Sequence, residues 1–142
     1  MTTPSEAEQL IYSQWLTDWT VSGSPRTPTV FEEERAPSSV RIGEDSWVYL
    51  YVQEVDRKQL TQGKAGNRRF LQKSQVVIAI FTPQSAGTQA ATDLAQAART
   101  VFEGNTIGAL RNFIGADIVR VGPKPPEFQV NVLCPFEYEE IK

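Results

Sequence analysis

Few residues of this 142-residue chain could carry out chemistry. The sequence contains no histidine, which is the commonest general base and the commonest metal ligand in proteins. Its one cysteine, Cys134, lies in the apolar segment VLCPF, which predicts a buried side chain and not a nucleophile. Ser-His-Asp and Cys-His arrangements are therefore excluded, and we expect neither a catalytic site nor a bound metal or cofactor.

Two acidic runs could in principle hold a metal ion or pair carboxylates for catalysis. They are Glu32 to Glu34, and the segment EYEE from Glu137 to Glu140. Neighbouring residues of a strand point to opposite faces, so the carboxylates of such a run do not converge. We expect both runs to be solvated.

The segment VVIAIFTPQSAGTQAATDLAQAARTVFEG, residues 76 to 104, has the form of a strand, a loop and a helix, an arrangement that binds phosphate in many enzymes. However, the loop has one glycine and no lysine, so it matches neither the P-loop nor the dinucleotide-binding pattern. We interpret it as a corner of the scaffold, where Pro83 ends the strand and Ser85 or Thr88 caps the helix. A small-ligand site between Ser85 and Thr88 is the alternative.

The remaining pattern predicts the elements of one domain. A helix starts at Thr3 and Pro4, with Ile11, Trp15 and Trp19 on one face and Leu10 and Leu16 beside them. A second helix covers about 85–103. Strands are expected at 29–35, 47–55, 70–81, 116–121 and 127–134, with a long hairpin connection at 56–69 and an acidic tail at 135–142. The prediction is a single-domain α+β fold over residues 1–142, with a mostly antiparallel mixed sheet of about four to five strands and two main helices.

Both faces of the central strands are apolar. Trp47, Tyr49 and Tyr51 alternate with Val48, Leu50 and Val52, and residues 76–81 show the same alternation. Both faces must therefore be covered. If the two helices pack on one face, the other face needs a partner subunit, and if they pack on opposite faces it does not. The sequence leaves both arrangements open.

The hairpin at 56–69 concentrates positive charge on a chain whose net charge is -3. Its cations are accompanied by Asp56 alone, and the rest of the chain is correspondingly acidic. The hairpin is either a solvated loop tip or a contact arm for an acidic surface on a neighbour. Direct binding of nucleic acid is less favoured, because no aromatic residues are interleaved for stacking. A basic arm on an acidic body suits head-to-tail assembly into a ring. The candidate contact residues are Arg57, Lys58, Lys64, Arg68 and Arg69.

No membrane partner is expected, because no apolar run reaches the roughly 18 residues that span a bilayer. The polar N-terminus MTTPSEAEQ does not resemble a signal peptide. We therefore expect a protein that is made and kept in a reducing cytosol.

Several segments together resemble the tail terminator proteins of long-tailed bacteriophages. These are the tryptophan-bearing first helix, TPTVFEEE, WVYLYVQ, GKAGNRRF, the strand–helix unit of residues 76–104, and FQVNVLCPFEYEE. The resemblance covers roughly residues 6–140 and includes no short catalytic signature.

The resemblance implies a mixed α/β domain that is not an enzyme. It implies a six-subunit ring on the head-proximal end of the tail tube, which ends tube polymerisation and joins the tail to the connector of the capsid. The partners would be other copies of the chain, the tail tube protein and the head–tail connector protein, and DNA would only pass through the lumen. The protein would reside in the virion after assembly in the host cytoplasm. A head-completion or neck protein, a tail tube subunit, and a small-ligand-binding module are the alternatives.

Overall fold

A computed structural model describes residues 2–21, 24–25, 27–31 and 46–142 of the chain. The candidate carboxylates Glu32, Glu33 and Glu34 lie outside these residues. The elements are α1 (Pro4–Asp18), β1 (Thr20–Val21), β2 (Ser24–Pro25), β3 (Thr29–Phe31), β4 (Trp47–Gln59), β5 (Arg69–Pro83), a short 3₁₀ turn η1 (Gln84–Ala86), α2 (Gly87–Phe102), β6 (Asp117–Lys124) and β7 (Glu127–Ile141).

The main sheet has five strands in the order β3-β4-β5-β7-β6. The pairs β4–β5, β5–β7 and β6–β7 are antiparallel, and β3 pairs with β4 in parallel. β1 and β2 form a small separate ribbon. The predicted α+β fold, with a mostly antiparallel mixed sheet and two main helices, is confirmed.

The first helix begins where the sequence indicates. The Thr3 side chain accepts a hydrogen bond from the Glu6 N–H at 3.2 Å, and Pro4 occupies the first turn. Ile11, Trp15 and Trp19 are fully buried, as predicted. The prediction for Leu16 is wrong, because a step of one residue turns it about 100° away from Trp15 and leaves it 56% exposed.

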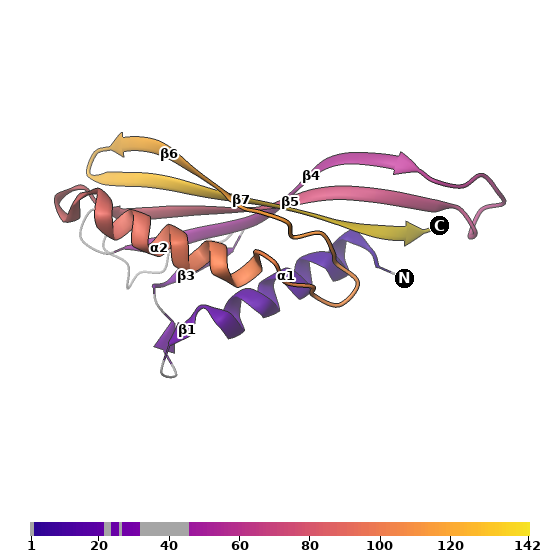
Figure 1. Ribbon diagram of the computed structural model, residues 1–142, viewed down its shortest axis with the longest axis horizontal. Helices are drawn as coiled ribbons and strands as arrows, with labels where there is room; N and C mark the ends of the chain where they lie inside the picture. The colour runs from indigo at the N-terminus through magenta and orange to yellow at the C-terminus, as the bar shows by residue number, and fades with distance from the viewer. Residues whose placement is uncertain (1, 22–23, 26, 32–45) are drawn as a thin grey trace.

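The second helix packs closely against β5 and β7. Ala91, Ala95 and Ala98 have no exposed surface, and small side chains of this kind let a helix approach a sheet. Both helices contribute to one core with the same set of alternating strand residues, which includes Leu50, Ile78 and Val132. Both helices therefore cover one face of the sheet, as Figure 1 shows, and the described chain leaves the opposite face without a helix.

Aromatic rings connect the helices to the sheet. The rings of Trp19 and Trp15 stack with their centroids 4.3 Å apart. The Phe102 ring contacts both Trp15 and Phe113, at a centroid distance of 6.1 Å in each case. The series continues from Phe113 to Phe136 at 5.2 Å. Phe113 lies in the segment that connects α2 to β6, and its ring anchors this segment to β7 and to the core.

Several predicted strand ends are wrong. β4 continues to Gln59, β5 extends from Arg69 to Pro83, β6 continues to Lys124 and β7 continues to Ile141. The expected hairpin connection is therefore strand at both of its ends, and nearly all of the expected acidic tail is strand. The reason is backbone pairing: β5 and β7 remain in register from Arg69 opposite Ile141 to Pro83 opposite Glu127. A continuous hydrogen-bond ladder overrides the low strand propensity of polar residues.

Candidate assembly interface

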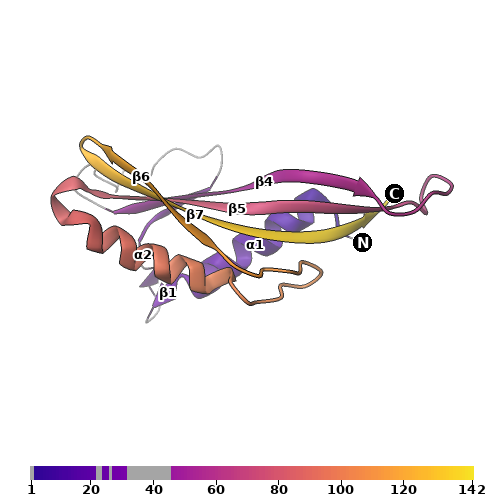
Figure 2. The same ribbon diagram turned by 45° about the horizontal axis from the view of Figure 1, so that its top comes forward.

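The far ends of β4, β5 and β7 form an extension that reaches beyond the helices. We call residues 56–73 the arm; they comprise the end of β4, the loop at residues 60–68 and the start of β5. Figures 1 and 2 show the loop of the arm projecting past both helices and both chain ends. The end of β7 runs along the arm, and the backbones of Arg68 and Lys142 exchange two hydrogen bonds of 3.2 and 2.8 Å. All five candidate contact residues lie on the arm.

Arg57 is held against the body of the chain. Its guanidinium lies 3.4 Å from the Glu140 carboxylate, donates to Gln72 Oε1 at 3.2 Å, and sits 4.7 Å from the centre of the Phe70 ring. Glu140 is only 7% exposed, so it requires a charged partner in the same chain. The structure therefore gives Arg57 a role within the fold.

Arg69 belongs to a second group of charges on the opposite face of the strands. Its guanidinium lies 2.7 Å from Glu139, which also receives a hydrogen bond of 3.2 Å from Arg111. Arg111 reaches Glu137 at 3.4 Å as well. The hydrogen bond from Arg111 lowers the pKa of Glu139 and raises the pKa of Arg111.

This grouping corrects the prediction that the segment EYEE is merely solvated. Glu137 and Glu139 lie two residues apart, so they share one face of β7 and converge on Arg111.

The other three candidates remain available for contacts. Lys58 and Lys64 are exposed, and within the described part of the chain neither has an ion pair or a side-chain hydrogen bond. Arg68 lies at the end of the loop, where its Nε atom is buried without a partner. A contact role for these three residues stays a prediction, whereas Arg57 and Arg69 form ion pairs within the fold.

Exposed aliphatic side chains lie on the face of the sheet that carries no helix. Ile114 is 82% exposed and Val55 is 62% exposed, and both border a hollow on this face. Val119 and Ile141 are also exposed on this face, but they lie far apart, because Val119 pairs with Asn131 of β7, whereas Ile141 at the end of β7 pairs with Arg69. Val55 and Ile114 at the hollow are therefore the candidates for a contact surface.

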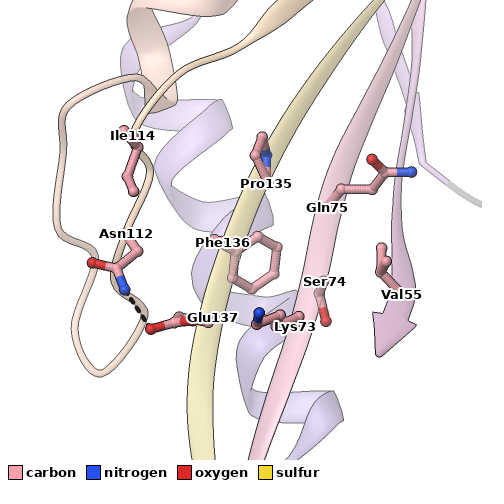
Figure 3. Close-up of a pocket in the computed structure, with 9 residues that line it drawn as sticks. All are labelled: Val55, Lys73, Ser74, Gln75, Asn112, Ile114, Pro135, Phe136 and Glu137. Atoms are coloured by element: carbon pink, nitrogen blue, oxygen red, sulfur yellow. Dashed lines mark hydrogen bonds between the residues drawn. The ribbon is translucent and has the colours of Figure 1, made fainter. Parts of the chain in front are cut away.

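The hollow, of about 300 Å³, lies where the arm joins the body. We call it the sheet groove. Figure 3 shows Ile114 and Val55 at its two ends, with the β5 and β7 strands between them and α1 behind. Lys73, Gln75 and Pro135 lie along its length. Sequence reasoning missed this groove, because Val55 and Ile114 are far apart in the chain and each lies in a locally polar segment.

One edge of the groove is fixed by the loop before β6. Asn112 has a positive φ of 62° and donates a hydrogen bond to Glu137, drawn in Figure 3. The backbones of Arg111 and Glu137 exchange two hydrogen bonds of 2.9 Å. Ile114 therefore lies on a loop that is anchored to β7. Ser74, which also lines the groove, has a buried hydroxyl with no hydrogen-bond partner among the described residues.

The chemistry-bearing residues are placed as follows. Cys134 is fully buried, as predicted, and burial raises the pKa of its thiol to about 12, with a smaller contribution from Glu103. Ser85 and Thr88 are exposed at the corner between β5 and α2, where the Gln84 N–H donates to the Pro126 carbonyl at 3.1 Å.

No cluster of three acidic or cysteine side chains among the described residues could hold a metal ion. Neither described helix is long and apolar enough to cross a membrane.

No protein-family model and no curated protein matches this chain. Solved structures do match. One of them superimposes with a TM-score of 0.66 over 94% of this chain and 96% of its own length, at 16% sequence identity, and it is named only by a sequence identifier. At that identity the likeness shows the fold alone.

Proposed function

We propose that this chain is a structural protein of a long-tailed bacteriophage that forms a ring on the head-proximal end of the tail tube. The ring would end tube polymerisation and offer the surface that joins the head–tail connector. In this proposal the chain is not an enzyme and uses no cofactor. Its partners are other copies of itself, the tail tube protein and the connector protein, with DNA passing through the lumen. It would reside in the virion after assembly in the host cytoplasm.

The observation that carries the proposal is the one-sided covering of the sheet. Both helices pack on one face, and the other face bears exposed aliphatic residues at Val55, Ile114 and Val119. A chain of this size has enough apolar residues to bury a core, so exposed aliphatic surface on one side favours association. The arm adds a second, cationic contact at some distance from the first.

Two different contact surfaces on one subunit support a head-to-tail interface. Such an interface closes into a ring when its rotation permits and otherwise grows into a fibre. The resemblance to tail terminator proteins supports the closed form. The contact residues in this proposal are Lys58, Lys64 and Arg68, while Arg57 and Arg69 hold the arm in place.

Native mass spectrometry and negative-stain imaging of the purified protein test the proposal. We expect closed rings of six copies, and we expect added rings to stop the growth of tubes from the tail tube protein of the same phage. Open fibres of this chain alone would favour the tail tube subunit instead. A monomer at every concentration, with no effect on tube growth, would contradict the proposal.

The Lys58→Glu, Lys64→Glu double variant tests the arm. We expect it to weaken assembly while the monomer stays folded, because both side chains are exposed and neither has an ion pair with any residue that the structure describes. Reversing Arg68 and Arg69 is a less clean test, because Glu at position 69 would face Glu139 and disturb the arm itself.

A further inference from the structure

The tip of the arm and the helix α1 carry opposite charges. Residues 58–68 contain the cations Lys58, Lys64 and Arg68 and no acidic residue. Helix α1 contains the acidic residues Glu6, Glu8 and Asp18 and no cation. Each surface therefore attracts the other and repels its own kind.

The exposed side of α1 also has a shape that can receive a side chain. A hollow of about 390 Å³ lies over its first half and is lined by Ser5, Glu6, Gln9, Leu10 and Ser13. The short serine side chains leave room above Leu10, which packs against the core and forms an apolar floor. The Glu6 carboxylate is exposed and has no ion pair among the described residues.

The tip of the arm has the complementary set of groups. Leu60 is 43% exposed at the start of the loop, with the exposed Lys58 and Lys64 close to it in the chain. An aliphatic side chain with a lysine on each side of it in the chain suits a hollow that combines Leu10 with the Glu6 carboxylate.

The arm cannot deliver its tip to the α1 helix of its own chain. The β4–β5 ladder pairs Gln59 with Phe70, and the β5–β7 ladder pairs Arg69 with Ile141, so three strands hold the arm extended almost to its loop. Figures 1 and 2 show the loop pointing away from the helices. A tip that docks on an α1 hollow therefore docks on that of a second copy.

We infer that the arm tip of one copy docks on the α1 hollow of the next, with Leu60 over Leu10 and Lys58 or Lys64 at Glu6. Other acidic residues of the helix layer are less suited, because Glu103 accepts a hydrogen bond of 2.8 Å from the Ala116 N–H and Asp93 lies on a helix that also carries Arg99. The contact joins two different surfaces, so it is head-to-tail. This inference rests on the proposed function only in requiring that copies of the chain assemble.

A charge swap between separate copies tests the contact. We expect the Lys58→Glu, Lys64→Glu variant and the Glu6→Lys variant each to weaken assembly by about tenfold in sedimentation velocity, because attraction is replaced by repulsion. Mixing the two variants should restore assembly, since every contact in an alternating ring then joins opposite charges. The wild-type protein should also assemble less well as salt is raised.

Two controls locate the effect. Asp93→Lys reverses the charge of an exposed acidic residue on α2, and Arg120→Glu reverses the charge of an exposed cation outside the arm. Both variants should assemble as the wild-type protein does. Equal weakening by Asp93→Lys, or no recovery on mixing, would overturn the contact.

The result separates the inference from the proposed function. Rings that tolerate Glu6→Lys would overturn the α1 contact and leave the ring intact. Assembly that is rescued by mixing but does not stop tube growth would contradict the proposed function and leave the contact intact. A wild-type protein that stays monomeric would overturn both.

Discussion

The carboxylate of Glu140 illustrates how single residues decide the use of the arm. Its Oε1 atom lies 3.4 Å from Arg57 and 3.9 Å from Lys142, while its Oε2 atom is buried without a partner. Loss of Arg57 would leave this mostly buried carboxylate with Lys142, at 3.9 Å, as its remaining ion-pair partner among the described residues, which is costly. Arg57 is therefore needed inside the chain, and the cations free to meet a neighbour are those nearer the tip.

The pKa of Glu139 gives a test of the second ion-pair group. Because Arg111 and Arg69 lower this pKa in the folded chain, the unfolded chain binds the proton more readily, and stability falls as pH falls. We expect the Glu139→Gln variant to be less stable than the wild type near pH 7. The difference should shrink below about pH 4.3, the ordinary pKa of glutamate, and vanish once the folded-state carboxylate is protonated.

Urea midpoints measured between pH 7 and pH 3 check this expectation. The control is Asp93→Asn, since Asp93 is exposed and carries no ion pair among the described residues. A Glu139→Gln protein whose deficit persists unchanged at pH 3 would show that its cost comes from something other than the charge.

Cys134 provides a second residue-scale test, because it is the single thiol of the chain. It is fully buried and its pKa is raised to about 12, so almost no thiolate is present at pH 8 and reagent cannot reach the sulfur. We expect no reaction with a disulfide reagent in the native protein and one thiol per chain in 8 M urea. Rapid stoichiometric labelling of the native protein would contradict the packing of β7 against the helices.

The helices and strands could be predicted where apolar side chains alternate or recur at a helical spacing. They could not be predicted where a strand is extended only by backbone pairing with its neighbour. Alternation in residues 47–52 and 76–81 fixed the central strands. Polar residues such as Asp56 and Glu139 gave no sign that β4 and β7 continue through them.

The position of the helices and the groove was also beyond the sequence. Apolar residues on both faces of β4 and β5 fit helices on one side or on two, and only the packed core decides between these arrangements. Val55 and Ile114 come together through the path of the loop before β6, which no local pattern encodes.

The end of β7 is the element on which the arm depends. Without it the arm is a two-stranded hairpin, and such hairpins are marginally stable in water. We expect removal of residues 137–142 to speed amide hydrogen exchange in residues 57–72 markedly. Residues 76–81 of β5, which stay between β4 and the remaining part of β7, should keep their protection. Unchanged exchange in the arm would show that β7 does not hold it.

The molecule as a whole has two sides with different roles. The helix side contains the buried aromatic series from Trp19 to Tyr138 and accounts for folding. The opposite side presents Val55 and Ile114 to solvent at the sheet groove, and Val119 outside it. Substitutions in the groove should therefore affect association and leave the folded monomer intact.

Ile114 is the sharpest place to test this division. At 82% exposure its side chain contributes little to the core, so Ile114→Thr should change the free energy of unfolding by less than about 0.5 kcal/mol. If the groove is a contact surface, the same change should weaken assembly by about tenfold, the size expected for an aliphatic residue at the centre of an interface.

Val119→Thr is the matched control, since Val119 is 43% exposed on the same face but outside the groove. Sedimentation velocity and urea unfolding of both variants separate the two effects. Normal assembly of the Ile114→Thr protein would mean that the sheet groove faces solvent in the assembled state.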